Sequence, residues 1–217
     1  MRMDSEQLKP IEFDVHIKNG SLRLAFVGMS NAGKSYRSKI LRDQAGFLWY
    51  HVDNEIQKTL GIEDLSSWLG HPSSEGYTKR QAEYLGLEDK FTRQAAIDTG
   101  GQNLVFDTTG SVIHLSKETL ALLSDNCLVV HLDVGESSLP AMMEKFFANP
   151  KPVAWDTFFS MLPGETEEAA LRRCYPALLS ERLRRYRELA HINIPADDVR
   201  DKSAVETLRI ICDRLTV

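Results

Sequence analysis

The sequence has few cysteines, no long apolar run and no excess of basic residues. Its cysteines, Cys127, Cys174 and Cys212, lie far apart and form no C-x-x-C pair, so they indicate no disulfide framework. No apolar segment approaches the ~18 residues that a membrane-spanning helix needs. The N-terminus also has no apolar signal-peptide core. We therefore expect a cytoplasmic protein in a reducing compartment, with no membrane partner.

The charge balance is acidic, with a formal net charge of −5. This disfavours a nucleic-acid partner, because contact with a phosphate backbone normally needs a basic face. The length of 217 residues suits one domain, and a hydrophobic share of 42% is ordinary for a soluble globular protein. We predict a single domain over residues 1–217, a monomer or weak homodimer, whose partner is a small-molecule substrate.

Residues 28–35 read Gly-Met-Ser-Asn-Ala-Gly-Lys-Ser and match G-x-x-x-x-G-K-[ST] at every fixed position. An apolar, strand-like run over 22–27 precedes this loop and a helical run over 36–43 follows it, which is the setting that a phosphate-binding loop requires. The glycines let backbone N–H groups point inward, and the helix adds its positive dipole end. The alternative is a chance Gly-Lys-Ser sequence in a tight turn from strand to helix.

The loop predicts a nucleoside-triphosphate site with ATP and Mg²⁺ as cofactors. Lys34 is expected to reach the β- and γ-phosphates and to act in catalysis, and the Ser35 hydroxyl to bind Mg²⁺. The residues expected to bind nucleotide are Gly28, Ser30, Asn31, Ala32, Gly33, Lys34, Ser35, Tyr36 and Pro195.

Strands and helices alternate along most of the chain. Apolar runs predict further strands over 47–52, 104–106, 128–132 and 191–194, and helical spacing predicts helices over 54–60, 76–99, 116–124 and 177–190. This alternation implies right-handed crossovers and a parallel sheet covered on both faces. We predict an α/β protein with the three-layer P-loop NTPase fold and a five-stranded parallel sheet.

Three segments lie outside this alternation. Apolar residues at every second position over 11–17, followed by Asn19-Gly20, predict an extra N-terminal antiparallel strand and hairpin; a loosely attached arm is the alternative. Residues 62–75 are expected to form a loop. Residues 136–175 are the least regular, since prolines at 150, 152 and 163 break any helix there. We predict an inserted helical lid at about 145–175.

Acidic residues follow three of the predicted strands, namely Asp53, Asp107 and Asp133. Ligands of parallel α/β sheets bind beyond the carboxyl ends of the strands. We therefore expect these residues, the loop from Gly28 and the loop from Pro195 to converge on one edge of the sheet, and this edge to be the site.

Asp107 ends an apolar strand, the position of an acid that holds Mg²⁺ through water in P-loop proteins. Capping of the next helix is the alternative. Thr108 and Thr109 are expected to hydrogen-bond phosphate or substrate, and Gly110 to let the backbone come close to it.

Asp53 is the candidate catalytic carboxylate. Phosphoryl transfer to a hydroxyl needs a group that orients the nucleophile and accepts its proton, and Asp53 directly follows the second strand. The alternative is an N-cap for helix 54–60. His51 is expected to line the substrate pocket, with a buried structural histidine as the alternative.

A mobile lid usually supplies the cations that neutralise a transferred phosphoryl group. Arg172 and Arg173 are the candidate catalytic arginines, with a solvated helix face as the alternative. For the basic residues that follow, the solvated face is the expected role: Arg182, Arg184, Arg185 and Arg187. Trp155 is expected to cover the substrate, with packing inside the lid as the alternative.

With these positions, the chain resembles the shikimate kinase family of P-loop kinases from about Leu22 to Leu215. The loop at 28–35 is similar to that family's nucleotide loop. The stretch 51–56 is similar to its Asp-x-Asp-x-x-Ile element, with His51 in place of the first Asp. Residues 107–112 occupy the place of its Gly-Gly-Gly substrate loop. The resemblance implies that Asp53 binds the substrate hydroxyl and that the chain transfers a phosphoryl group to a small metabolite.

The chain also departs from that family. Shikimate kinases clamp the substrate carboxylate with two arginines, and neither pattern is found here. Tyr175 to Leu179 keeps the shape of the family's Arg-Pro-Leu-Leu stretch, with Cys174 rather than Arg before it. Met142 stands where the family has an adenine-stacking arginine. The resemblance therefore implies an ATP- and Mg²⁺-dependent kinase whose acceptor is not shikimate.

Two other functions are open. The missing arginines are also expected of a kinase-like regulator that binds nucleotide without catalysis. A GTPase-like switch is the second alternative, because residues 107–110 satisfy D-x-x-G. No Asn-Lys-x-Asp occurs in the chain, so the usual carboxylate that reads guanine is missing.

Overall fold

The computed structural model describes residues 10–97, 101–148 and 153–215. A five-stranded sheet lies at its centre, with the strand order β2-β3-β1-β4-β5 and every pair parallel. The strands are β1 (Arg23–Val27), β2 (Leu48–His51), β3 (Leu104–Asp107), β4 (Leu128–Asp133) and β5 (Ile192–Pro195). The predicted parallel α/β sheet is confirmed.

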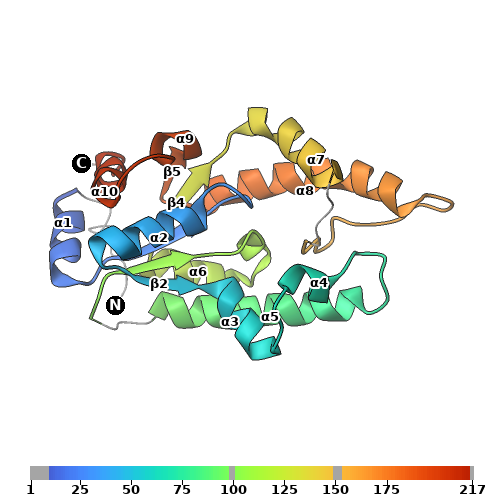
Figure 1. The fold of residues 1–217 in the computed structure, drawn as a ribbon, viewed down its shortest axis with the longest axis horizontal. Coiled ribbons are helices and arrows are strands. Elements are labelled where there is room, and N and C mark those ends of the chain that lie inside the picture. Colours follow the sequence, from blue (N-terminus) through green and yellow to red (C-terminus); the bar gives the residue numbers. More distant parts are fainter. Residues whose placement is uncertain (1–9, 98–100, 149–152, 216–217) are drawn as a thin grey trace.

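Helices cover both faces of the sheet (Figure 1). On one face, α2 (Lys34–Ala45) packs with α10 (Ala204–Asp213), which contacts α1 (Pro10–Asn19). The right-handed crossovers that this strand order requires place α5 (Tyr77–Ile97), α6 (Lys117–Asn126) and α8 (Glu167–Leu189) on the other face. The other α-helices are α3 (Val52–Leu60), α4 (Leu65–Leu69), α7 (Leu139–Ala148) and α9 (Ala196–Val199).

The strand register brings the carboxyl ends together. His51 of β2 pairs with Asp107 of β3, and Asp133 of β4 pairs with Pro195 of β5. β1, β3 and β4 are buried along almost their whole length, as expected for strands covered on both faces. The predicted convergence of these strand ends on one edge is therefore observed.

The predicted N-terminal strand is wrong, because residues 10–19 form the helix α1. Phe13 is buried and Ile17 is half-buried, and these residues lie four apart on one helical face. Ile11 and Val15 are exposed. The segment therefore forms a helix that buries Phe13 and part of Ile17, although the alternation of apolar and polar residues suggested a strand.

The Asn19-Gly20 pair ends this helix and makes no hairpin. Gly20 has a φ of +66°, and its N–H donates to the carbonyl of Ile17 at 3.3 Å. The N–H of Ser21 donates to the carbonyl of His16 at 2.9 Å. These two bonds form a Schellman motif, which uses the same left-handed glycine that a hairpin turn would use.

Two other predicted boundaries differ. The predicted loop 62–75 contains α4, which Asp64 caps by accepting hydrogen bonds from the N–H groups of Ser66 and Ser67. α8 begins at Glu167 rather than at residue 177 and continues through Pro176. The region 136–175 is thus helical at both ends, and residues 149–152 lie outside the described residues.

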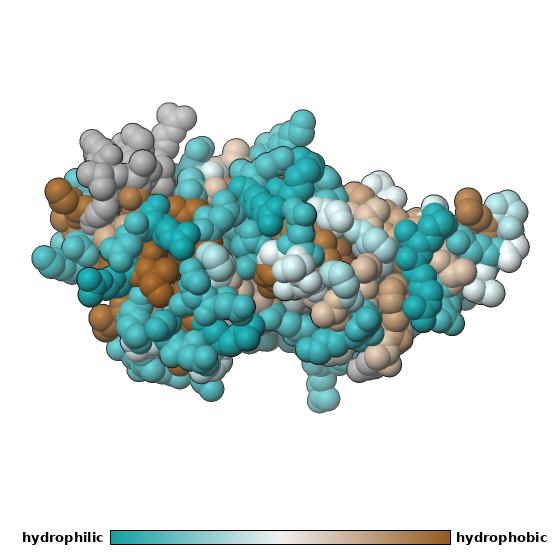
Figure 2. Space-filling model, turned by 90° about the horizontal axis from the view of Figure 1, so that it is seen from above, coloured by the Kyte–Doolittle hydropathy of each residue, from teal (hydrophilic) through white to brown (hydrophobic). Residues whose placement is uncertain are grey.

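The face of the molecule in Figure 2 is mostly hydrophilic. Exposed apolar side chains occur mainly as scattered positions, of which Ile11 and Val205 are the most exposed. None of the helices in the described ranges is both long and apolar enough to cross a bilayer.

Arg37 ties the loop helix α2 to the C-terminal part of the chain. Its side chain is buried, and its guanidinium donates to the carbonyls of Lys202 and Arg200, the latter at 2.9 Å. It also donates to the hydroxyl of Thr207 at 3.2 Å. Because the buried guanidinium needs these acceptors, the three bonds fix the position of α2 relative to residues 200–207.

We expect Arg37→Met to destabilise the protein by about 2–4 kcal/mol, since one buried and two partly buried acceptors lose a charged donor. The midpoint of thermal unfolding should fall by roughly 4–16 °C. Denaturant unfolding measures the change in the free energy of unfolding, and thermal unfolding measures the midpoint. The matched control is Arg209→Met, which removes an exposed arginine and should change stability by less than about 0.5 kcal/mol. Equal stability of the two variants would contradict the anchoring role.

Candidate active site

The loop between β1 and α2 closely approaches the sheet. Gly28 has a φ of +143°, and a Cβ placed there would lie 2.9 Å from the carbonyl oxygen of Leu132 in β4. A side chain is therefore excluded at this position. Gly33, with a φ of +93°, leads directly into α2. The loop thus presents the N-terminus of α2 at the edge where the strands end, an arrangement that favours anions.

Lys34 is buried at the start of α2. Its ammonium donates to the loop carbonyls of Gly28 at 2.9 Å and Met29 at 3.1 Å. Burial lowers the pKa of Lys34, and the nearby carboxylates of Asp107 and Asp53 oppose this shift. A cation is therefore held at the loop in the field of two acids.

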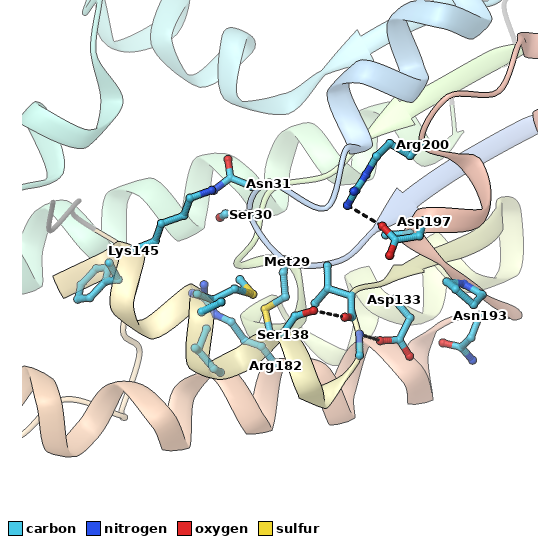
Figure 3. Close-up of a pocket in the computed structure, with 18 of the residues that line it drawn as sticks. Met29, Ser30, Asn31, Asp133, Ser138, Lys145, Arg182, Asn193, Asp197 and Arg200 are labelled. Carbon is cyan, nitrogen blue, oxygen red and sulfur yellow. Dashed lines mark hydrogen bonds and ion pairs between the residues drawn. The ribbon is translucent and has the colours of Figure 1, made fainter. Parts of the chain in front are cut away.

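A cavity of about 1260 Å³ lies in front of this loop. Ser30, Asn31 and Pro195 line it, as expected of nucleotide-binding residues, and Met142 lines it too. Figure 3 shows the Lys145 side chain extending from α7 toward Asn31.

Not every predicted nucleotide-binding residue borders the cavity. Gly28 and Ala32 are buried within the loop. The ring of Tyr36 is exposed and lies 4.7 Å from the guanidinium carbon of Arg37. The structure therefore places Tyr36 outside the cavity.

Asp107 carries an orphaned carboxylate oxygen. The residue is buried, its Oδ2 lies 3.5 Å from Nε2 of His51, and it has no hydrogen-bond partner. Asp107 does not cap a helix, because Ser111 and Ser116 occupy the N-cap positions that follow. An unpartnered buried carboxylate oxygen fits Mg²⁺ or a water bound to it.

The donor set at this point suits a magnesium ion that also binds phosphate. In the described part of the chain, no three His, Cys, Asp or Glu side chains cluster as a metal site. Mg²⁺ usually takes one or two protein oxygens and completes its shell with water and substrate phosphates. Ser35, exposed in the first turn of α2, and Asp107 are the residues that would hold it.

Asp53 lies in the first turn of α3 and does not cap it. The cap is His51, whose Nδ1 accepts from the N–H of Asn54 at 3.3 Å. The carboxylate of Asp53 instead accepts a hydrogen bond from the Tyr84 hydroxyl at 3.3 Å. Burial raises the pKa of Asp53, while His51 and Lys34 counteract the shift.

A smaller pocket of about 150 Å³ opens above Asp53. Its walls include Asp53, Leu65, Leu69, Tyr84, Gly110 and Ser111. Ser30, Ser66, Val153 and Arg182 border both this pocket and the large cavity. The two spaces therefore adjoin each other at the phosphate-binding loop.

Arg182 is the arginine that the structure brings to the site, and the predicted solvated position for it is wrong. The side chain is only 5% exposed and borders both cavities. It donates to the carbonyl of Ala154 at 2.7 Å, while its Nε has no hydrogen-bond partner. Its spacing of four residues from Leu178 and Tyr186 places it on the buried stripe of α8, and this sequence signal was available.

Arg172 and Arg173 lie away from both cavities. Arg172 pairs with Glu168, and Arg173 pairs with Glu165 and donates to the carbonyl of Ser160. Both arginines are exposed. The alternative of a solvated helix face therefore describes these two arginines.

Thr108 and Thr109 hold the loop after β3 in place. The Thr108 hydroxyl donates to the carbonyl of Phe26 at 2.8 Å, and that of Thr109 donates to the carboxylate of Glu88. Both hydroxyls therefore donate to protein groups, and not to phosphate or substrate as we expected. Gly110 does line the small pocket, and a Cβ there would lie 3.2 Å from the hydroxyl of Ser30.

Trp155, in the segment between α7 and α8, belongs to an aromatic cluster. It is 1% exposed, and its ring centroid lies 5.4 Å from that of Phe159 and 5.6 Å from that of Tyr175. Trp155 lines neither cavity. Packing, the alternative to substrate cover, is what the structure shows.

These features define the class of the protein: a P-loop α/β protein with a phosphate-binding loop, a large cavity beside it and a second, smaller pocket. The parallel sheet, the glycine loop and the buried Lys34 are the parts of that class that the described residues display.

The chain is similar in sequence and in fold to known proteins of this class. A curated shikimate kinase from Dehalococcoides mccartyi is 29% identical over 199 residues, 92% of this chain and 94% of that protein. The shikimate kinase from Acinetobacter baumannii, solved in complex with shikimate, has a TM-score of 0.60 and 20% identity, over 90% of this chain and 96% of that chain. The shikimate kinase from Bacteroides thetaiotaomicron has a TM-score of 0.59 and 18% identity, over 88% of this chain and 97% of that chain. No protein-family model matches the chain.

The solved structures confirm the predicted fold over nearly the whole chain. The predicted resemblance to shikimate kinases is likewise confirmed in sequence and in fold.

Proposed function

We propose that this protein is a small-molecule kinase that transfers the γ-phosphoryl group of ATP to a hydroxyl of a metabolite. The observation that carries the proposal is the junction of the two cavities. Ser30 of the phosphate-binding loop and Arg182 border both, and Asp53 faces the smaller one. A triphosphate in the large cavity would thus point its outer end at an acceptor held over Asp53.

Asp53 is the best placed of the three strand-end acids to accept a proton. Asp133 is neutralised by Arg187, whose Nε lies 2.9 Å from its carboxylate. Asp107 is buried with an unpartnered carboxylate oxygen and fits Mg²⁺ better than an acceptor hydroxyl. Only Asp53 among these three borders the small pocket, where it would orient the acceptor and take its proton.

The cationic side chains that would contact the phosphates come from three helices. Lys34 would bind the outer phosphates, Arg182 would stabilise charge at the junction, and Lys145 would reach the phosphates from α7. Mg²⁺, held by Ser35 and Asp107, would neutralise phosphate charge. Val153 and Ala154 wall the small pocket, which supports our proposal that residues 145–175 act as a lid on a single domain.

The acceptor is a small hydroxylated molecule, in our proposal, and not shikimate. The small pocket combines two leucines and a tyrosine with one arginine, where the resemblance implies two. Arg182 has an unpartnered buried Nε that an oxygen of the acceptor would satisfy.

A screen of MgATP consumption tests this proposal. The panel contains shikimate, gluconate and nucleosides, each with and without the protein, and mass spectrometry identifies the phosphorylated product. We expect turnover with a hydroxylated metabolite other than shikimate. Absence of any product across the panel, with Mg²⁺ and ATP saturating, would contradict the kinase assignment.

Lys34→Met tests the nucleotide site separately. Because the ammonium makes charge-assisted bonds worth about 1.5–3 kcal/mol, we expect MgATP affinity to fall roughly 10- to 100-fold. Isothermal titration calorimetry measures it. Lys39→Met, an exposed lysine of the same helix, should leave affinity within about twofold. Equal affinity of the two variants would contradict a phosphate contact for Lys34.

A regulator that binds nucleotide without catalysis is the second candidate. The exposed ion pairs of Arg172 and Arg173 favour it, because they leave the predicted lid arginines away from the site. It requires that ATP raise the thermal midpoint while no acceptor is phosphorylated. The GTPase alternative has less support, since Thr108, Thr109 and the carbonyl of Gly110 are all held by protein partners and a switch loop must move.

A further inference from the structure

A buried carboxyl group, Glu88, lies on α5 next to the small pocket. Its side chain is fully buried. One carboxyl oxygen accepts a hydrogen bond from the hydroxyl of Thr109, and the other lies 2.6 Å from the hydroxyl oxygen of Ser111. The Ser111 oxygen lies 3.2 Å from that of Tyr84, and Tyr84 donates to Asp53 at 3.3 Å. A continuous chain of oxygens therefore connects Glu88 to the candidate catalytic carboxylate.

The hydrogens along this chain can be counted. Each hydroxyl has one hydrogen, so Ser111 donates to only one of its three oxygen neighbours, which belong to Glu88, Tyr84 and Thr109. If Glu88 is ionised, it accepts hydrogen bonds from both Thr109 and Ser111. Ser111 then has no hydrogen left to donate to Tyr84. If Glu88 is protonated, it donates to Ser111, Ser111 donates to Tyr84, and Tyr84 donates to Asp53. The protonated form thus gives one hydrogen to every contact along the path from Thr109 through Glu88 to Asp53 and leaves Asp53 as the final acceptor. The side contact between the hydroxyl oxygens of Thr109 and Ser111, 2.9 Å apart, has no hydrogen in either form.

We propose that Glu88 carries a proton in the working protein and, through Ser111 and Tyr84, orients a one-way hydrogen-bond chain that ends on Asp53. Glu88, Ser111 and Tyr84 are then positioning residues. The chain holds one oxygen of the Asp53 carboxylate, so that the other is directed at the acceptor. The kinetic part of this inference rests on the proposed kinase function, whereas the protonation of Glu88 does not.

The surroundings of Glu88 support a neutral carboxyl. Burial raises the pKa of Glu88 to about 7, which outweighs the hydrogen bonds from Ser111 and Thr109. The titratable and charged groups that face it come from its own helix and from α2, α3 and α8: Tyr84, Lys34, Asp53, Arg182 and Tyr186.

Two substitutions separate this role from simple packing. In Glu88→Gln, the amide donates to Ser111 and accepts from Thr109, so it imitates the protonated acid at every pH. Ser111→Ala interrupts the chain but retains both carboxyl groups. Glu83→Gln, an exposed glutamate on the same helix, is the matched control.

The first readout is a ¹³C NMR titration of the carboxyl carbons, assigned with Glu88→Gln and Asp53→Asn. We expect Glu88 to titrate near pH 7 rather than near its ordinary value of 4.5. The Asp53 signal should shift a second time in that same pH range. This second shift should vanish in Glu88→Gln and in Ser111→Ala, and persist in Glu83→Gln. An ordinary pKa for Glu88, or a second shift that survives in Ser111→Ala, would overturn the proposal.

Stability gives an independent check. The folded pKa of Glu88 is raised, so its contribution to the free energy of unfolding is fully present below pH 4.5 and is lost as pH rises through about 7. The thermal midpoint of Glu88→Gln, relative to that of the wild type, should therefore increase across this window. A constant difference would mean that Glu88 is ionised throughout.

The kinetic readout uses MgATP and the best acceptor from the panel. We expect wild-type kcat to fall about threefold to tenfold as pH rises through 7, which is the worth of one oriented hydrogen bond. Glu88→Gln should lack this decline, and a decline that persists in it would overturn the kinetic role. If no acceptor is phosphorylated while Glu88 still titrates near 7, the kinase function fails and the assignment of the proton stands.

Discussion

Asp53→Asn is expected to lower kcat by roughly 10²- to 10⁴-fold, the range that general-base groups contribute, while MgATP affinity stays within about twofold. Asparagine keeps the shape of the side chain and can still accept the hydrogen bond from Tyr84. It cannot take a proton from an acceptor hydroxyl. The loss should therefore appear in turnover, in steady-state assays with the acceptor found in the panel.

The pH profile separates this chemical role from a structural one. Burial raises the pKa of Asp53, and a base acts only when ionised. Wild-type kcat should therefore decline as pH is lowered through that pKa, and Asp53→Asn should lack the decline. Asp125→Asn, at an exposed position in α6, is the control and should behave as wild type. An unchanged rate in Asp53→Asn would remove Asp53 from the mechanism.

The phosphate-binding loop and the sheet edge could be predicted because both are local patterns. The motif at 28–35 specifies its own backbone, and Asp107 and Asp133 directly end apolar strands. Parallel strands then bring these ends together, whatever the details of packing. This explains why the convergence of the strand ends on one edge was predicted correctly from residues far apart in the sequence.

Hydrogen-bond partners could not be predicted in the same way. Asp53 and His51 follow one another so closely that either could cap α3, and the structure selects His51. Thr108 and Thr109 have hydroxyls suited to phosphate, but Phe26 and Glu88 accept their hydrogens. Which partner a short polar side chain takes depends on the neighbouring elements, and these are brought close only by the fold.

The arginines illustrate the same limit on a helix. Arg172, Arg173 and Arg182 all belong to α8, yet only Arg182 lies on its buried stripe. The helical spacing in the sequence predicts a start at residue 177, which separates Arg172 and Arg173 from Arg182. The four-residue spacing of Leu178, Arg182 and Tyr186 lies within the predicted helix and indicates which arginine is directed inward. The boundary at Glu167 places Arg172 and Arg173 on the exposed side of the same helix.

Arg182→Met should lower kcat/KM for the acceptor by roughly 10²- to 10³-fold, comparable to the loss of one preorganised donor to a developing charge. Methionine fills much of the volume but offers no hydrogen to an acceptor or phosphate oxygen at the junction of the two cavities. Arg182→Lys should recover only part of the loss, because it restores the charge without the planar array of N–H groups. Steady-state kinetics with varied acceptor and with varied MgATP separate the two contributions.

The comparison that decides the role of Arg182 is with Arg173→Met, which removes an exposed arginine of the same helix and should change kcat/KM by less than about twofold. Arg182 also donates to the carbonyl of Ala154, so the variant must first be shown to be folded, by its thermal midpoint and its MgATP affinity. If Arg182→Met is folded and active while Arg173→Met is not, phosphoryl charge is neutralised from the N-terminal segment of α8. The lid arginine expected from the sequence would then replace Arg182 in the mechanism, because only movement of that segment could bring Arg173 to the phosphates.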